Sequence, residues 1–305
     1  MGAGFSYGRI ALLGLTYWSA MTCVTLFNVY VPVLLREFVA STGVVGIVMS
    51  IDNIASLTLA PWCAALSDRV RTRFGRRLPF LIAGMPLAAA AFPLLPLAPT
   101  LGVMMFAIVV YDVAKSISGQ PGAALMIDLT PEEKRSQANA LYSFMGNLGA
   151  LTALFAGSWV YRISPALAFG AAAVFLLVSL AAVLVGIREP ETAQASNREA
   201  VGRTLRAAVS ILREHPRLLC TLVAVFSTGI GHSAIEAFFT TYAVVELGWH
   251  ESTGAFLLGF LGLAFFVFIG PAGVLAARWG LHVAMERAHS CSRSSRRLRR
   301  LSAPS

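Results

Sequence analysis

The sequence predicts an all-α membrane protein, a bundle of helices that crosses the bilayer several times. Hydrophobic residues make up 57% of the 305-residue chain and charged residues only 13%, and the mean hydropathy is +0.71. Water-soluble domains do not have this composition. The apolar stretches are continuous and do not alternate in short blocks, which favours helices over a β-barrel.

Eight segments are long enough to cross the hydrocarbon core as helices, which takes about 20 apolar residues each. They are residues 10–34, 43–66, 80–98, 101–126, 137–160, 165–187, 217–243 and 253–277. The first segment lacks the basic region, short apolar core and cleavage site of a signal peptide, so we expect it to be retained as a span.

The polar stretch after the sixth span divides the chain. We predict a six-helix bundle over residues 1–187 and a cytoplasmic connecting loop over residues 188–216. Within that loop, residues 200–214 place apolar side chains on one face, as an interfacial helix does. A partial second bundle over residues 217–277 and a basic, disordered tail over residues 278–305 complete the predicted organisation.

Arginines predict which loops face the cytoplasm. The loop at 67–79 contains five arginines, and short loops rich in Lys and Arg remain on the cytoplasmic side. Alternation then places the basic loops at 127–136 and 188–216 on the same side, whereas the opposite loops carry little more than Arg36 and Arg162. We therefore expect a cytoplasmic N-terminus and a location in the cell (inner) membrane.

The formal net charge of +9 suggests nucleic acid as one partner class, but most of that charge lies at one end. Residues 278–305 contain seven arginines and one glutamate, a balance of +6. A basic tail next to the cytoplasmic leaflet is attracted to anionic lipid, so we expect the bilayer and no nucleic acid as partner. The four cysteines have no paired spacing, which indicates neither a disulfide framework nor a metal site.

Two similar motifs occur six spans apart. The second span ends in Ala-Ala-Leu-Ser-Asp-Arg (64–69), and Gly75, Arg76 and Arg77 follow after an insertion. The eighth span ends in Gly-Val-Leu-Ala-Ala-Arg-Trp-Gly (273–280), with Ala277 in the aspartate position. Both resemble the signature loop of the major facilitator superfamily, and their recurrence fits a fold of repeated halves.

Further motifs narrow the resemblance. The pattern SDR-x-R-x-R-FGRR-x-PF at 67–80, Tyr111-Asp112 and the run at 121–139 resemble the glycoside, pentoside and hexuronide cation symporters, especially the sucrose–proton symporter branch. This resemblance implies the major facilitator fold and a monomer without cofactors that moves a sugar or glycoside with H⁺ by alternating access. Complete members have twelve spans, so we expect this chain to be truncated after the eighth, where the tail resembles out-of-frame translation.

Ionisable side chains at membrane depth are candidate functional residues, because each costs at least about 2.5 kcal/mol to insert. Asp52 and Asn53 lie in the middle of the second span, and we expect both to face the central cavity. Asp112 and Lys115 are close enough on the fourth span to form an ion pair. The alternative in each case is a purely structural polar contact or neutralised pair. The resemblance implies that Asp112 binds the coupling proton or sugar hydroxyls.

The seventh span adds His232 and Glu236, which share a helix face and could pass a proton between them. A hydrogen bond between packed helices is the alternative, and the resemblance of residues 235–239 to the family pattern favours Glu236. Aromatic and amide groups suited to a sugar are Tyr17, Trp18, Asn28, Tyr30 and Asn147.

The loop motif predicts a cytoplasmic gate. Its residues are Asp68, Arg69, Gly75, Arg76, Arg77 and Asp128. Charge-assisted hydrogen bonds among them would hold neighbouring helix ends together, although orientation by positive charge alone is a second explanation. Residues 130–133 (Thr-Pro-Glu-Glu) predict a helix start with Thr130 as the cap.

The sequence contains no nucleophile with a matching base, no phosphate-binding loop and no metal cluster, so we predict no enzyme. Two alternatives to sugar–proton symport remain. One is a facilitator of the same fold that moves another small solute. The other is a truncated, non-transporting membrane protein that binds a partner or lipid through its basic tail.

Overall fold

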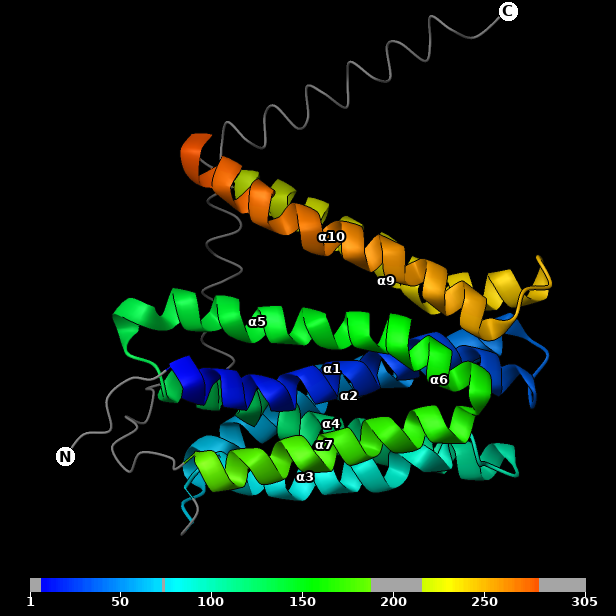
Figure 1. Ribbon diagram of the computed structural model, residues 1–305, viewed down its shortest axis with the longest axis horizontal. Helices are drawn as coiled ribbons and strands as arrows, with labels where there is room; N and C mark the ends of the chain where they lie inside the picture. Colours follow the sequence, from blue (N-terminus) through cyan, green and yellow to red (C-terminus); the bar gives the residue numbers. More distant parts are fainter. Residues whose placement is uncertain (1–6, 73–74, 188–215, 280–305) are drawn as a thin grey trace, which may run out of the picture. The chain divides into compact units, whose positions relative to one another are not determined.

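The computed structural model describes residues 7–72, 75–187 and 216–279, and these residues are almost entirely helical (Figure 1). The helices are α1 (Tyr7–Arg36), α2 (Thr42–Arg69), α3 (Leu78–Ala91), α4 (Leu101–Asp128), α5 (Arg135–Thr152), α6 (Ser158–Ile163), α7 (Pro165–Gly186), α9 (Pro216–Val245) and α10 (Glu251–Trp279). The chain divides into two compact units between Gly259 and Phe260. All contacts described below lie within the first unit.

Each of the eight predicted spans is helical, with ends that differ by a few residues from those expected. The third span is the shortest because Pro93, which lacks a backbone N–H, converts its end into the 3₁₀ turn Phe92–Leu94. The fifth span consists of α5 and α6 joined by a π-helical turn, Ala153–Gly157, which the sequence did not indicate. The predicted interfacial helix and the basic tail lie outside the described residues.

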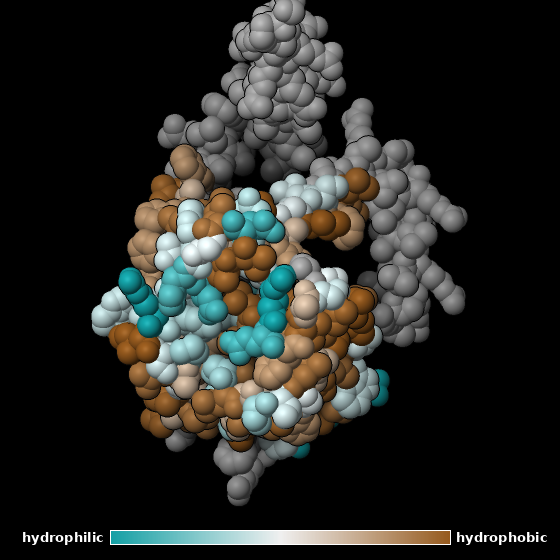
Figure 2. Space-filling view, turned by 90° about the vertical axis from the view of Figure 1, so that its right-hand side faces the viewer, coloured by the Kyte–Doolittle hydropathy of each residue, from teal (hydrophilic) through white to brown (hydrophobic). Residues whose placement is uncertain are grey.

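Length and composition allow five of the described helical segments to cross a membrane. They are Tyr7–Arg36, Gly43–Arg69, Leu101–Asp128, Glu132–Ile163 and Pro165–Gly186, and two shorter apolar segments are Leu78–Leu94 and Glu251–Ala264. Large apolar side chains are exposed on them, including Leu57 (78% exposed) and Val185 (89% exposed). In Figure 2, hydrophobic residues (brown) cover much of the visible surface around a group of hydrophilic residues (teal). Such a surface suits a lipid environment and not water.

Small residues bring α1 and α5 into close contact. A Cβ atom on Gly149 would lie 2.2 Å from the Trp18 carbonyl oxygen, and a Cβ atom on Gly146 would lie 2.2 Å from the Tyr17 ring. Glycine at 149 therefore lets the two backbones approach this closely, as is common between helices in membranes, and glycine at 146 leaves room for the Tyr17 ring. The Trp18 indole N–H also donates a hydrogen bond to Thr152 Oγ1 at 3.0 Å.

Hydroxyl groups and aromatic rings connect the remaining helices of the first bundle. Ser19 on α1 and Ser179 on α7 are hydrogen-bonded at 2.7 Å, and both are buried. Phe92 packs against Tyr111 of α4 and Phe169 of α7, with ring centroids 5.1 and 4.7 Å apart. These contacts fix α4 relative to α1 and α7, and α4 carries the charged residues of the site.

Candidate functional site

Three charged side chains from two helices form a cluster inside the bundle. The Lys115 ammonium on α4 forms an ion pair with Asp52 Oδ1 on α2 and lies 3.8 Å from Asp112 Oδ1, one helical turn earlier on α4. The predicted Asp112–Lys115 pair is therefore present, and Asp52 joins it. We refer to Asp52, Asp112 and Lys115 as the charge cluster.

Asp112 is the most deeply buried member of the charge cluster. Its side chain is 1% exposed, compared with 17% for Asp52 and 21% for Lys115. Within the part of the chain that the structure describes, neither Asp112 oxygen accepts a hydrogen bond. A buried carboxylate without hydrogen-bond donors is costly. This cost falls if the carboxylate binds a proton, because its neutral form needs less solvation.

The charges in the cluster do not balance. Two ionised carboxylates and one ammonium sum to −1 at a depth where an uncompensated charge is expensive. One proton shared between Asp52 and Asp112 would bring the sum to zero.

Other predicted site residues are placed differently. Asn53, next to Asp52, is exposed and does not line the cavity described below. Ser56 donates a hydrogen bond to Asp52 Oδ1 at 3.5 Å, in agreement with their shared helix face. His232 and Glu236 lie on α9, but their side chains are outside the described residues.

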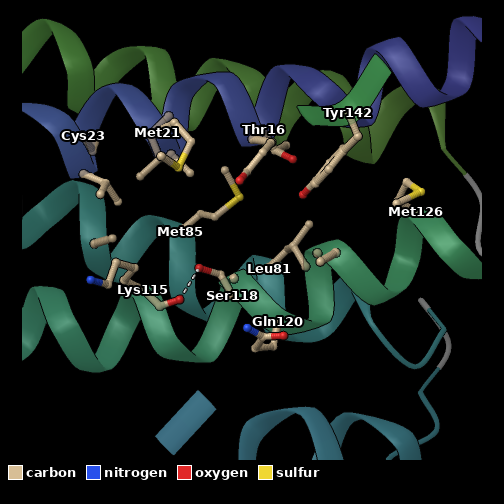
Figure 3. Close-up of a pocket in the computed structure, with 18 of the residues that line it drawn as sticks. Thr16, Met21, Cys23, Leu81, Met85, Lys115, Ser118, Gln120, Met126 and Tyr142 are labelled. Carbon is tan, nitrogen blue, oxygen red and sulfur yellow. Dashed lines mark hydrogen bonds between the residues drawn. The ribbon is translucent and has the colours of Figure 1, made fainter. Parts of the chain in front are cut away.

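A cavity of about 430 Å³ lies between α1, α3, α4 and α5, with Leu176 of α7 also at its wall. Figure 3 shows Met21, Met85 and Tyr142 pointing into it from different helices. Lys115 is the charged side chain in the described lining. In Figure 3 its ammonium is turned away from Tyr142, at the edge of the cavity. The charge cluster thus adjoins the cavity through Lys115, whereas Asp52 and Asp112 do not line it.

The aromatic and amide residues expected to bind a sugar do not converge on this cavity. Tyr17 lines it and stacks on Tyr142, with ring centroids 4.4 Å apart and planes 5° from parallel. Tyr30 instead donates a hydrogen bond to Ser158 Oγ at 3.1 Å. Trp18 bonds to Thr152, Asn28 is half-buried, and Asn147 is exposed; none of the three lines the cavity. Sequence reasoning missed Tyr142 because a lone tyrosine in an amphipathic span carries no motif.

The predicted gate residues form an ionic network at one end of the bundle. Arg77 contacts Asp68 Oδ1 at 2.5 Å, Ser67 Oγ at 2.5 Å and Asp128 Oδ2 at 3.2 Å. Arg76 contacts the same Asp128 oxygen at 3.3 Å. Both arginines are buried. The network joins the ends of α2, α3 and α4, and its arginines favourably oppose the negative C-terminal ends of α2 and α4.

Two further parts of the gate motif have different roles from the network. Gly75 has a φ of 107°, a conformation that favours glycine, and its backbone pairs with Thr72 in a tight turn. This turn returns the chain from α2 so that Arg76 and Arg77 reach Asp128. Arg69 is exposed at the end of α2.

The prediction that Thr130 caps a helix is wrong. Its hydroxyl is buried and donates a hydrogen bond to the Met126 carbonyl at 2.7 Å, one turn earlier. The following helix begins with the 3₁₀ turn Glu132–Lys134, whose start has no side-chain cap. Back-bonding to the preceding turn competes with capping for the same hydroxyl, and here the preceding turn prevails.

A contact at the opposite end of the bundle was not anticipated. The Tyr161 hydroxyl on α6 donates a hydrogen bond to Glu251 Oε2 at the start of α10, at 2.6 Å. Tyr161 is buried and stacks on Tyr30 with centroids 3.7 Å apart. This contact joins the fifth span to the eighth. No sequence motif identified it, because Glu251 lies outside the apolar run that predicted the eighth span.

The apolar helices, which enclose the charge cluster and the cavity, define a polytopic membrane protein. A family model described as Major Facilitator Superfamily matches residues 13–288. The chain therefore belongs to this superfamily, whose members are transporters and not enzymes, as the sequence predicted.

Individual relatives support this assignment. The chain is 25% identical over 279 residues to the class B tetracycline resistance protein of Escherichia coli, covering 89% of this chain and 67% of that protein. It is 27% identical over 192 residues to the multidrug resistance protein MdtH of Cronobacter sakazakii, covering 61% of this chain and 46% of that one. The chain thus spans about half to two thirds of the length of these relatives.

Solved structures show the same fold at low sequence identity. A bacterial homolog of the human lysosomal transporter Spinster, in an inward-facing and unoccupied conformation, aligns with a TM-score of 0.71 at 15% identity, covering 92% of this chain and 64% of that chain. A D-xylose–proton symporter aligns with a TM-score of 0.59 at 17% identity, covering 89% and 68%.

Proposed function

We propose that this protein is a secondary transporter that couples the movement of a small solute to a proton. The charge cluster is the observation that carries the proposal, because two carboxylates share one ammonium where a net charge is costly. One proton neutralises the cluster. A transporter needs such a group, whose proton affinity depends on its neighbours and therefore on the conformation of the helices around it.

Asp112 is the proposed proton carrier, with Asp52 as its partner through Lys115. Movement of α2 relative to α4 would separate Lys115 from Asp52, since the two residues are on different helices, but not from Asp112 one turn away. Lys115 would then neutralise the Asp112 carboxylate alone. The proton bound to Asp112 would therefore be released. Asn53, His232 and Glu236 remain proposed supporting residues.

The arginine network is the proposed gate at the cytoplasmic end. It consists of Ser67, Asp68, Arg76, Arg77 and Asp128 and fixes three helix ends to one another. A cytoplasmic N-terminus in the cell (inner) membrane is part of the same proposal, because it places this network inside.

The proposed cargo is a sugar or glycoside, on the strength of the loop and span-four motifs. Export of an amphipathic compound is the second candidate. It is supported by the resistance proteins among the relatives and by the three methionines, Met21, Met85 and Met126, that line the cavity. Methionine adapts to varied apolar shapes.

Reconstituted vesicles test the coupling directly. The 305-residue chain is placed in vesicles with a pH-sensitive dye inside, and a solute is added outside without a pH gradient. Proton movement that follows solute addition supports coupled transport, and its direction separates symport from exchange. Solute flux without proton movement would show an uncoupled facilitator. No flux with any tested solute would favour a non-transporting protein.

A further inference from the structure

We propose that the cavity of the first bundle is a binding site for an uncharged amphipathic compound with a flat ring, such as an aryl glycoside, and not for a free sugar. This inference rests on the proposed function and specifies its cargo. The described lining comes from α1, α3, α4, α5 and α7. Among the residues that the structure describes, the lining thus comes from helices of the first six spans.

The cavity walls favour apolar groups and rings. Met21, Met85 and Met126 project thioethers from three different helices. Thioethers contact aromatic rings favourably. Tyr17 and Tyr142 present a stacked pair to the same space, and aromatic faces pack well against another flat ring. The volume of about 430 Å³ lies in the range of small-molecule sites.

Few polar groups in the cavity are available for a ligand. The Thr16 hydroxyl donates to the Leu13 carbonyl at 2.7 Å, and the Ser118 hydroxyl donates to the Ala114 carbonyl at 3.1 Å. Each hydroxyl oxygen can still accept a hydrogen bond from a ligand, but its own proton is already donated to the backbone. The phenols of Tyr17 and Tyr142 also line the cavity, and a phenol can donate to a ligand oxygen. Gln120, Asn139 and Ser143 also line the cavity and are exposed residues.

A free sugar would bind poorly in these surroundings. It exposes hydroxyls on all sides, and each one buried against a thioether or methyl group without a partner costs about 1–3 kcal/mol. A compound with one polar side and one ring could direct its oxygens to the two phenols and its ring to the methionines. An anionic ligand lacks a free cation, since Lys115 is already paired with Asp52. A cationic ligand finds no carboxylate in the described lining.

Binding of two matched glucosides tests the inference. Phenyl β-D-glucoside and methyl β-D-glucoside have the same sugar and differ in the ring. Isothermal titration calorimetry of the 305-residue chain in detergent, with empty micelles as the blank, is expected to give at least tenfold tighter binding of the phenyl compound. Equal affinities, or no binding of either, would overturn the proposal.

A cavity-filling substitution locates the site. A Cβ atom on Gly122 would meet only Tyr142 Oη at 3.7 Å and Leu81 Cδ1 at 4.0 Å, both cavity residues. Gly122→Leu should therefore fill the cavity and weaken phenyl glucoside binding at least tenfold. Gly170→Leu is the control, because a Cβ atom on Gly170 meets nothing within 4 Å and this residue does not line the cavity. Equal losses in both variants would contradict the location.

The binding measurement is independent of proton coupling. It is made at equilibrium without a membrane gradient, so a chain that binds the phenyl compound but moves no protons would refute the proposed function and leave this site intact. Coupled transport of a sugar without selective binding of the phenyl compound would support the proposed function and refute this binding site.

Discussion

Lys115 on α4 is paired with Asp52 on α2, 63 positions earlier in the chain, while Asp112 lies one turn from the same lysine. The lysine thus stands between a partner on its own helix and a partner on another. Because the Asp52 contact crosses between helices, it depends on how α2 and α4 are placed, and the Asp112 contact does not. This difference gives the charge cluster its proposed sensitivity to conformation.

Removing the lysine charge should destabilise the protein, and removing one carboxylate as well should restore part of the loss. Lys115→Met leaves two carboxylates without their cation, for which a cost of about 3 kcal/mol or more is typical of buried pairs. Lys115→Met with Asp52→Asn has one negative charge fewer. Thermal unfolding in detergent of the two single variants and the double variant measures the interaction energy between Lys115 and Asp52. Strictly additive effects would show that Lys115 and Asp52 do not interact.

The arginine network should need the guanidinium shape and not only its charge. Arg77 contacts Asp68, Ser67 and Asp128 in different directions, and an ammonium lacks the planar fork that spans them. Arg77→Lys should therefore lower the unfolding temperature by several degrees. Arg69→Lys, at an exposed position of the same motif, is the control and should change little. Similar shifts in unfolding temperature for both variants would show that only the positive charge at these positions matters, and not the guanidinium shape.

The contact between α1 and α5 should not tolerate a methyl group. In Gly149→Ala the new Cβ would lie 2.2 Å from a backbone oxygen of α1, so the helices must separate, which typically costs about 1–3 kcal/mol. Gly170→Ala, with open space around it, should be neutral or slightly stabilising because alanine favours helix. Thermal unfolding of the two variants measures this difference. A Gly149→Ala protein as stable as the unmodified chain would contradict the close packing of α1 on α5.

The Tyr161–Glu251 hydrogen bond should contribute measurably to stability. Tyr161→Phe keeps the ring that stacks on Tyr30 and removes only the donor. Hydrogen bonds to charged groups contribute about 1.5–3 kcal/mol, so a loss near the lower end is expected. Tyr7→Phe removes the donor to Gln137 at an exposed position, and the same measurement should show a smaller loss. An unchanged Tyr161→Phe protein would mean that the contact does not hold α6 to α10.

The sequence predicted local features of the fold well and distant contacts poorly. Continuous apolar runs located all eight helical segments, and five of the described segments are long and apolar enough to cross a bilayer. The spacing of Asp112 and Lys115 predicted their pairing, since residues three apart share a helix face. The π-helical turn Ala153–Gly157 carries no such local pattern.

Contacts between helices join residues that are far apart in the sequence, so no local sequence pattern predicts them. Asp52 was placed at membrane depth, but its partner Lys115 is on another span. The stacking of Tyr17 on Tyr142 depends on the close approach of α1 and α5 at Gly146 and Gly149. The gate residues Arg77 and Asp128 were identified only because the loop resembles a known motif.

One comparison tests the central claim, that the charge cluster carries the coupling proton. Asp112→Asn keeps the size of the side chain and removes its charge and its ability to bind and release a proton. Vesicles with the unmodified chain and the variant are assayed for solute exchange at equal pH and for solute uptake driven by a pH gradient. We expect Asp112→Asn to retain exchange and lose gradient-driven uptake at least tenfold. Gradient-driven uptake at the unmodified rate would contradict the account.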